Sequence, residues 1–121
     1  ADLEVMTPAP SSVRLGGELF LQLMKRRPDV DGIFFGNDDL AQGALYEACR
    51  HGVRVPEQVA IVGFNDLAGS ADSVPRLTTV RTPRAEMGRI AAQLLLALID
   101  NERVARPAVD LGFELIVRES A

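Results

Sequence analysis

Residues 32–66 read GIFFGNDDLAQGALYEACRHGVRVPEQVAIVGFND. Gly32–Gly36 and Val59–Phe64 are continuous apolar runs, which is typical of strands buried on both faces. Between them, apolar side chains recur at helical spacing. Strand, helix and strand in this order predict a right-handed crossover and an α/β fold, with a parallel sheet and helices on both faces.

The helix expected inside this stretch has clear ends. Asn37 is a good cap, and Asp38 and Asp39 follow in the first turn, where carboxylates meet the positive end of the helix dipole. We expect both carboxylates to be dipole partners or solvated. Gly52 ends the helix. Its apolar stripe, expected to face the core, is Leu40, Ala41, Ala44, Leu45, Ala48 and Cys49.

A strand, a loop and a helix are predicted before this stretch. Leu3–Met6 is a short apolar segment, and the prolines of Thr7–Ser12 forbid regular structure there while its serines can cap a helix. From Val13 apolar residues recur at helical spacing up to the cations Lys25–Arg27, and Pro28 ends the helix.

An extended segment, a third helix and a last strand are predicted after it. Leu77–Arg81 is extended, and a helix over residues 84–100 follows, with Thr82 as its cap and Pro83 in the first helical position. Phe113–Val117 is the last strand. The apolar stripe of the third helix is Met87, Ile90, Ala91, Leu94, Leu95 and Leu98.

Composition limits the functions that this chain can have. Its 121 residues are 47% hydrophobic, which fits one compact domain, and a net charge of -4 with scattered Lys and Arg argues against direct nucleic-acid binding. No apolar run approaches a membrane span of about 20 residues. The N-terminal residues show no leader, and Cys49 and His51 are the only residues of their kinds. We therefore expect no cofactor, no metal cluster and a cytoplasmic location.

Three polar segments follow predicted strands and should share one edge of the sheet. They are Thr7–Ser12, Asn37–Asp39 and Asn65–Asp66. In open parallel sheets the ligand crevice lies beyond the carboxyl ends of the strands. Amides, hydroxyls and carboxylates there suit a hydroxyl-rich or amide-rich small molecule. Asn37 remains equally well explained as a helix cap, and Asn65–Asp66 as a turn.

The residues offer little support for an enzyme. A nucleophile–base pair would need His51, which lies at the far end of its helix and so at the opposite edge of the sheet. The remaining enzyme alternative is metal-assisted chemistry, with Mg²⁺ held by Asp38, Asp39 and Asp66. We predict a binding module rather than an enzyme.

A series of motifs along the chain resembles the C-terminal half of LacI/GalR transcriptional repressors. The motifs are PDVDGIF (28–34), NDDLAQGA (37–44), GVRVPEQVAIVGFND (52–66), PRLTTVR (75–81), EMG (86–88) and ELIVRES (114–120). The resemblance implies a type I periplasmic-binding-protein-like pair of subdomains with a small effector in the cleft between them. A helix-turn-helix head, which alone contacts operator DNA, is expected to be absent here.

The same resemblance implies three segments. Residues 1–80 would be the C-terminal effector-binding subdomain, 81–108 a crossover and helix that pack on the missing N-terminal subdomain, and 109–121 a returning strand. We expect the bare helix to dock on another copy of the chain, giving a homodimer.

Effector contacts carried over by motif are Ser11 or Ser12, Asn37, Asn65 and Thr82. Relatives usually have an acid at Asn65 and often an aromatic at Ser11. The residues found here instead resemble gluconate-responsive repressors, which implies a sugar or sugar-acid effector. A sugar-binding receptor of a transport or signalling system is the alternative function, because fold alone does not settle function.

Overall fold

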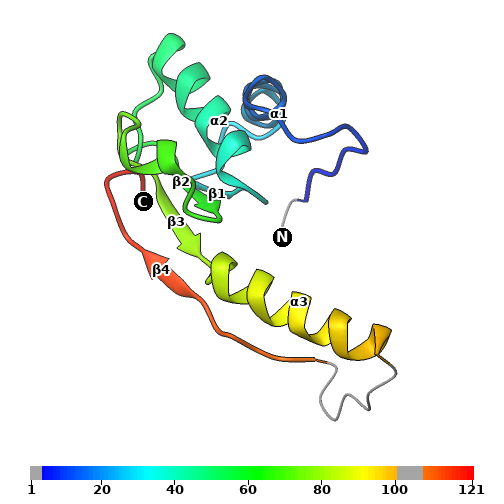
Figure 1. Ribbon diagram of the computed structural model, residues 1–121. Helices are drawn as coiled ribbons and strands as arrows, with labels where there is room; N and C mark the ends of the chain where they lie inside the picture. Colours follow the sequence, from blue (N-terminus) through cyan, green and yellow to red (C-terminus); the bar gives the residue numbers. More distant parts are fainter. Residues whose placement is uncertain (1–3, 101–107) are drawn as a thin grey trace. The chain divides into compact units, whose positions relative to one another are not determined.

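The computed structural model describes residues 4–100 and 108–121, and the chain divides into two units. Unit 1 is Ala1–Arg81 with Leu115–Ala121, and unit 2 is Thr82–Glu114. Residues 101–107 of the expected segment 81–108 lie outside the described residues. The elements in chain order (Figure 1) are α1 (Val13–Arg26), β1 (Gly32–Phe34), α2 (Asp38–Arg50), β2 (Ala60–Phe64), the short 3-10 helix η1 (Ala68–Ala71), β3 (Thr78–Arg81), α3 (Arg84–Ile99) and β4 (Glu114–Ile116).

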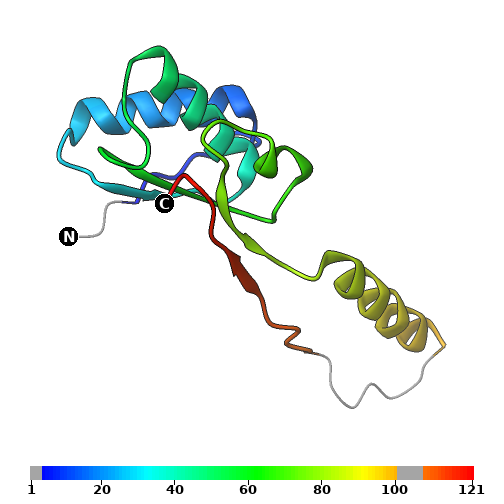
Figure 2. The ribbon, with the colours of Figure 1, turned by 90° about the vertical axis from the view of Figure 1, so that its left-hand side faces the viewer.

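The strands form one mostly parallel sheet in the order β1-β2-β3-β4. β1 and β2 are parallel with Phe34 opposite Val62, and β2 and β3 are parallel with Phe64 opposite Val80. Helix α2 connects β1 to its neighbour β2, as expected for a crossover. The predicted α/β class, a parallel sheet with flanking helices, is confirmed. The expectation of helices on both faces is wrong for unit 1, because its described helices α1 and α2 lie on one side (Figure 2).

Helices α1 and α2 pack against each other and lie on the same side of the sheet (Figure 2). The core between them and the strands is Phe20, Phe35, Ala41, Ala44, Leu45, Ala48, Val59, Ile61 and Leu77. Phe34 points away from this core, is 62% exposed and meets Phe64 edge-to-face at 6.4 Å between ring centroids. The expectation that Gly32–Gly36 is buried on both faces is therefore wrong, because unit 1 has described helices on one face only and β1 is the outermost described strand.

Local signals at the helix ends are confirmed for α1 and α2. The Ser12 side chain accepts a hydrogen bond from the Leu15 amide at 3.1 Å, and Gly52 has a φ of +67°, which an L side chain rarely adopts. Helix α3 differs. It begins at Arg84 with Pro83 in the cap position and without a side-chain cap, so the predicted capping by Thr82 is wrong.

Two further expectations need correction. Glu4–Met6 form no strand in the described part of the chain, and Leu3 lies outside it; a strand requires a hydrogen-bonded neighbour, and this segment makes no ladder with β1. Cys49 is exposed rather than buried. The buried side of α2 is already complete with Ala48, so the neighbouring Cys49 faces solvent as an isolated thiol.

Helix α3 is described over its whole length, and none of its residues is buried. Its exposed large hydrophobic residues are Met87, Leu95, Leu96, Leu98 and Ile99, which are between 48% and 64% exposed. Leu96 and Ile99 lie outside the predicted stripe, so the exposed apolar surface in the second half of α3 is wider than predicted. No helix within residues 4–100 and 108–121 is long and apolar enough to cross a membrane.

Candidate functional site

The candidate site is the edge of unit 1 at which the parallel strands β1, β2 and β3 end. Asn37 follows the end of β1, and Asn65 follows β2 directly. Since β1 and β2 are hydrogen-bonded neighbours, the two loops that carry these asparagines leave adjacent strands on the same side. The structure thus brings together two of the predicted site residues, and we call this edge the rim.

Asn37 combines a structural role with a free donor group. Its Oδ1 accepts a hydrogen bond from the Leu40 amide at 3.0 Å, which confirms the predicted N-cap of α2. The side chain is half-buried. Its amide nitrogen donates to no residue in the described ranges. The cap uses the carbonyl oxygen of the side-chain amide, so the NH₂ group remains available for a ligand.

Asn65 is held in an unusual backbone conformation. Its φ is 103° and that of Asp66 is 49°, so the chain turns sharply after β2. The Asn65 backbone amide donates to the carbonyl of Val80 at 2.8 Å. Its half-buried side chain makes no hydrogen bond to a described residue. The predicted turn at Asn65–Asp66 is therefore present. Residues strained in this way persist where the surrounding structure fixes them, often at binding sites.

Asp38 is a buried anchor, contrary to the expectation of a dipole partner or solvated residue. Its side chain is fully buried and accepts three hydrogen bonds. Thr79 Oγ1 donates to Oδ1 at 2.6 Å, and the Leu67 amide and Ser70 Oγ donate to Oδ2 at 2.6 Å and 2.7 Å. These bonds tie the start of α2 to β3 and to the loop that follows Asn65.

Asp66 is paired with two arginines. Arg81 Nε donates to Oδ2 and Arg118 Nη2 donates to Oδ1, each at 2.7 Å. Burial by itself would raise the pKa of Asp66, but the two arginine hydrogen bonds outweigh burial and hold the pKa below its usual value. The Asp66 carboxylate therefore stays ionised.

These contacts bear on the predicted Mg²⁺ alternative. The oxygens of Asp38 and Asp66 already accept protein donors. Among the residues described, no three acidic, histidine or cysteine side chains gather in a way that suits a metal ion. The arrangement of Asp38, Asp39 and Asp66 does not form the site that this alternative requires.

The other predicted site residues are Ser11, Ser12 and Thr82. Ser12 uses its hydroxyl to cap α1, and Ser11 is exposed in the preceding loop. Thr82 is the first residue of unit 2, where its carbonyl accepts a hydrogen bond from the Arg84 amide at 2.8 Å. Their grouping with Asn37 and Asn65 stays a prediction.

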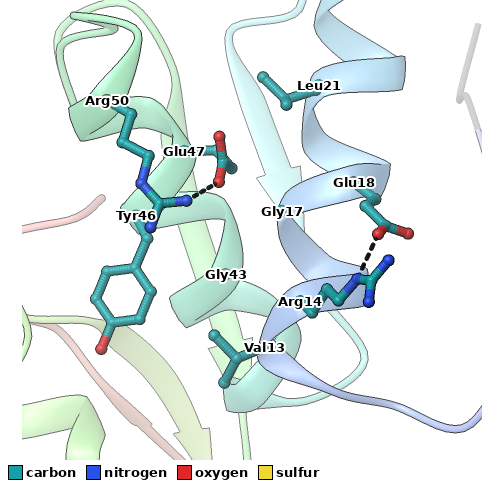
Figure 3. Close-up of a pocket in the computed structure, with 9 residues that line it drawn as sticks. All are labelled: Val13, Arg14, Gly17, Glu18, Leu21, Gly43, Tyr46, Glu47 and Arg50. Carbon is teal, nitrogen blue, oxygen red and sulfur yellow. Dashed lines mark hydrogen bonds and ion pairs between the residues drawn. The ribbon is translucent and has the colours of Figure 1, made fainter.

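A groove on the outer side of α1 and α2 was not predicted from the sequence (Figure 3). It has a volume of about 370 Å³, and its lining includes Gly17 of α1 and Gly43 of α2. Its charged side chains are already paired, Arg14 with Glu18 and Arg50 with Glu47. The sequence signal that could have indicated this groove is the presence of glycines inside both helices. We do not assign the effector to this groove, because its charges satisfy one another.

A small apolar cavity adjoins the rim. Its volume is about 120 Å³, and its lining includes Gly36, which precedes Asn37, and Leu40, whose amide donates to the Asn37 side chain. Ligand pockets usually measure about 300–1,000 Å³. This cavity alone is too small and too apolar to enclose a polar small molecule.

Comparison with known proteins gives consistent results. The model of the periplasmic binding protein-like domain family matches residues 3–121. The HTH-type transcriptional regulator GntR of Pseudomonas aeruginosa is 64% identical over 118 residues, which are 98% of this chain and 34% of that protein. The chain thus spans about a third of the length of the curated relatives it matches.

Solved structures agree. The crystal structure of the transcription regulator GntR from Chromobacterium violaceum has a TM-score of 0.84 at 49% identity, covering 93% of this chain and 42% of that one. A LacI family regulator from Arthrobacter sp. FB24 in complex with lactose has a TM-score of 0.79 at 29% identity, with the same coverages of 93% and 42%.

The fold and the family match define a portion of a periplasmic binding protein-like domain, and these relatives are transcriptional regulators, not enzymes. The chain belongs to the LacI family of transcriptional regulators and is part of their effector-binding domain.

Proposed function

We propose that this chain is the C-terminal effector-sensing part of a longer LacI-type repressor and that it binds a sugar or sugar acid. The observation that carries the proposal is the pair of half-buried asparagines at the ends of neighbouring parallel strands. The proposed contacts are Ser11 or Ser12, Asn37, Asn65 and Thr82. We also propose that residues 1–80, 81–108 and 109–121 are the three segments implied by the resemblance. Operator DNA would be bound by a helix-turn-helix head outside this chain.

Asn65 favours a sugar acid over a neutral sugar. An amide can donate to a carboxylate and also accept from a hydroxyl, whereas an aspartate at this position would repel a carboxylate. The complex of the Arthrobacter relative with lactose supports a sugar-like ligand in general. We therefore choose D-gluconate as the probe and D-glucose as its neutral counterpart.

Substitutions at the two asparagines test this proposal in the full-length regulator. Asn37→Ser keeps an oxygen that can cap α2, and Asn65→Gly tolerates the positive φ. We expect each to weaken D-gluconate binding by about 1–3 kcal/mol, because polar groups of the ligand lose their partner. Calorimetric titration and thermal melting measure the affinity and the stability separately.

The controls sharpen this test. Gln22→Ser removes an exposed amide from α1 and should leave the affinity unchanged. Asn65→Asp should lower the affinity for D-gluconate, and it should lower any affinity for D-glucose by less. If both rim variants bind D-gluconate as tightly as the unsubstituted protein, the assignment of the site is wrong.

We also propose that α3 is covered by a second copy of the chain. A contiguous apolar surface of this kind is normally covered, and the second half of α3 leaves large hydrophobic side chains 58% to 64% exposed, namely Leu95, Leu96, Leu98 and Ile99. We expect light scattering to give a dimer for this chain. Leu95→Glu combined with Leu98→Glu should give a monomer, and Gln93→Glu on the same helix should remain dimeric. A stable, monodisperse monomer of the unsubstituted chain would contradict this proposal.

A further inference from the structure

Asp66 links three segments that are far apart in the sequence. It follows Asn65 in the turn after β2, Arg81 is the last residue of β3, and Arg118 lies in the tail after β4. The Asp66 side chain is 12% exposed, and its two oxygens each accept a different arginine at 2.7 Å. Both pairs are charge-assisted hydrogen bonds, which are the stronger kind.

The two arginines mark the places where the chain leaves and re-enters unit 1. The first segment of unit 1 ends at Arg81, and its second segment begins at Leu115, shortly before Arg118. Arg118 is further fixed because its Nη1 donates to the carbonyl of Leu77 at 2.7 Å. One carboxylate therefore holds both connecting segments.

Backbone amides near the Asp66 carboxylate join the same three segments, which are the turn after β2, strand β3 and the tail after β4. The Asn65 amide donates to the Val80 carbonyl at 2.8 Å, and the Asp66 amide donates to Thr79 Oγ1 at 3.4 Å. The Arg118 amide donates to Thr78 Oγ1 at 2.9 Å. These bonds join the strained turn of Asn65 to β3 and join β3 to the tail.

We propose that Asp66 is the positioning residue of the candidate site: its carboxylate clamps the two segments that connect the units and thereby holds Asn65 on the rim. This inference rests on the proposed function, because it concerns the turn that carries Asn65. An effector that binds Asn65 would act directly on the clamp. The clamp is therefore the route by which occupancy of the rim reaches both connecting segments.

Hydrogen exchange of this chain tests the clamp without any ligand. In Asp66→Asn we expect the amides of Asn65, Asp66 or its replacement, and Arg118 to exchange at least tenfold faster. The amides of Phe35 and Ala60, which are bonded to the carbonyls of Val62 and Asp31, should keep their rates. Unchanged reporters, or equal acceleration of all these amides through general destabilisation, would overturn the proposal.

Two variants serve as controls. Asp29 also accepts two hydrogen bonds from one arginine, Arg27, but lies between α1 and β1, so Asp29→Asn should change none of the reporters. Arg81→Gln removes one arm of the clamp and should accelerate Asn65 and Asp66 while sparing Arg118. If Asp66→Asn does not fold, Arg81→Gln decides: acceleration confined to Asn65 and Asp66 supports the clamp, and any other pattern overturns it.

A D-gluconate titration of the full-length regulator separates this inference from the proposed function. If the unsubstituted protein does not bind D-gluconate, the proposed effector is wrong, and the exchange rates still decide on the clamp. If it binds, Asp66→Asn should lose at least tenfold in affinity and Asp29→Asn none. Unchanged affinity in Asp66→Asn, with its reporters accelerated, would overturn the positioning role.

Discussion

Gly43→Ala is expected to destabilise unit 1 by about 3 kcal/mol, at the upper end of the usual cost of overpacking. A Cβ atom at this position would lie 1.8 Å from the backbone carbonyl oxygen of Val13 and 2.7 Å from the amide nitrogen of Gly17. Both obstacles are backbone atoms, so no side chain can rotate away. Helices α1 and α2 would have to separate, and the core beneath them would open.

The expected loss exceeds a gain that acts in the opposite direction. Alanine is better than glycine inside a helix by about 1 kcal/mol. Gly88→Ala in α3 is the control, with both variants made in the monomeric Leu95→Glu and Leu98→Glu background, because a Cβ at Gly88 of the single chain has open space and only the helix gain remains. Urea denaturation followed by circular dichroism measures both variants. A Gly43→Ala protein as stable as the Gly88→Ala protein would contradict the close packing of α1 on α2.

Asp38→Ala is expected to cost about 3 kcal/mol or more, because three hydrogen-bond donors inside the protein would lose their acceptor. The Leu67 amide and the hydroxyls of Ser70 and Thr79 would lose their acceptor inside the protein. A buried donor without an acceptor costs about 1–3 kcal/mol. The loop after Asn65 would lose its attachment to α2.

Asp39→Ala is the control for this prediction. Asp39 is the next residue in the same helical turn, and no hydrogen bond of its side chain to a described residue is present. Its removal should cost at most about 1 kcal/mol through the helix dipole. Denaturation curves of the two variants give the comparison. Equal losses would mean that the hydrogen bonds of Asp38 contribute nothing specific.

The helices and strands could be predicted from the sequence because their signals are local. Ser12 and Asn37 cap the helices that directly follow them, and Gly52 ends α2. Asn65 could be placed at the rim because it directly follows a recognisable strand. The predicted edge therefore depended only on where each strand ends.

The roles of Asp38 and Asp66 could not be predicted because they depend on distant partners. Asp38 binds Leu67, Ser70 and Thr79, which lie 29, 32 and 41 positions away, and Asp66 binds Arg118 at 52 positions. First-turn carboxylates ordinarily face solvent, and nothing local distinguishes Asp38 from Asp39.

The burial of individual side chains could not be predicted, for a related reason. An apolar strand such as β1 is buried on both faces only if both faces are covered, and that depends on elements beyond the strand itself. Phe34 therefore faces away from the core while Phe35 belongs to it. Cys49 illustrates the same limit at the edge of a helix stripe, where one position decides between core and solvent.

The central claim is that Asn37 and Asn65 hold the effector at the rim. A crystal structure of the full-length regulator with D-gluconate bound tests this claim most directly. We expect a side-chain nitrogen or oxygen of each asparagine within about 3.2 Å of an oxygen of the ligand. D-gluconate bound elsewhere, with both asparagines contacting only protein, would contradict it.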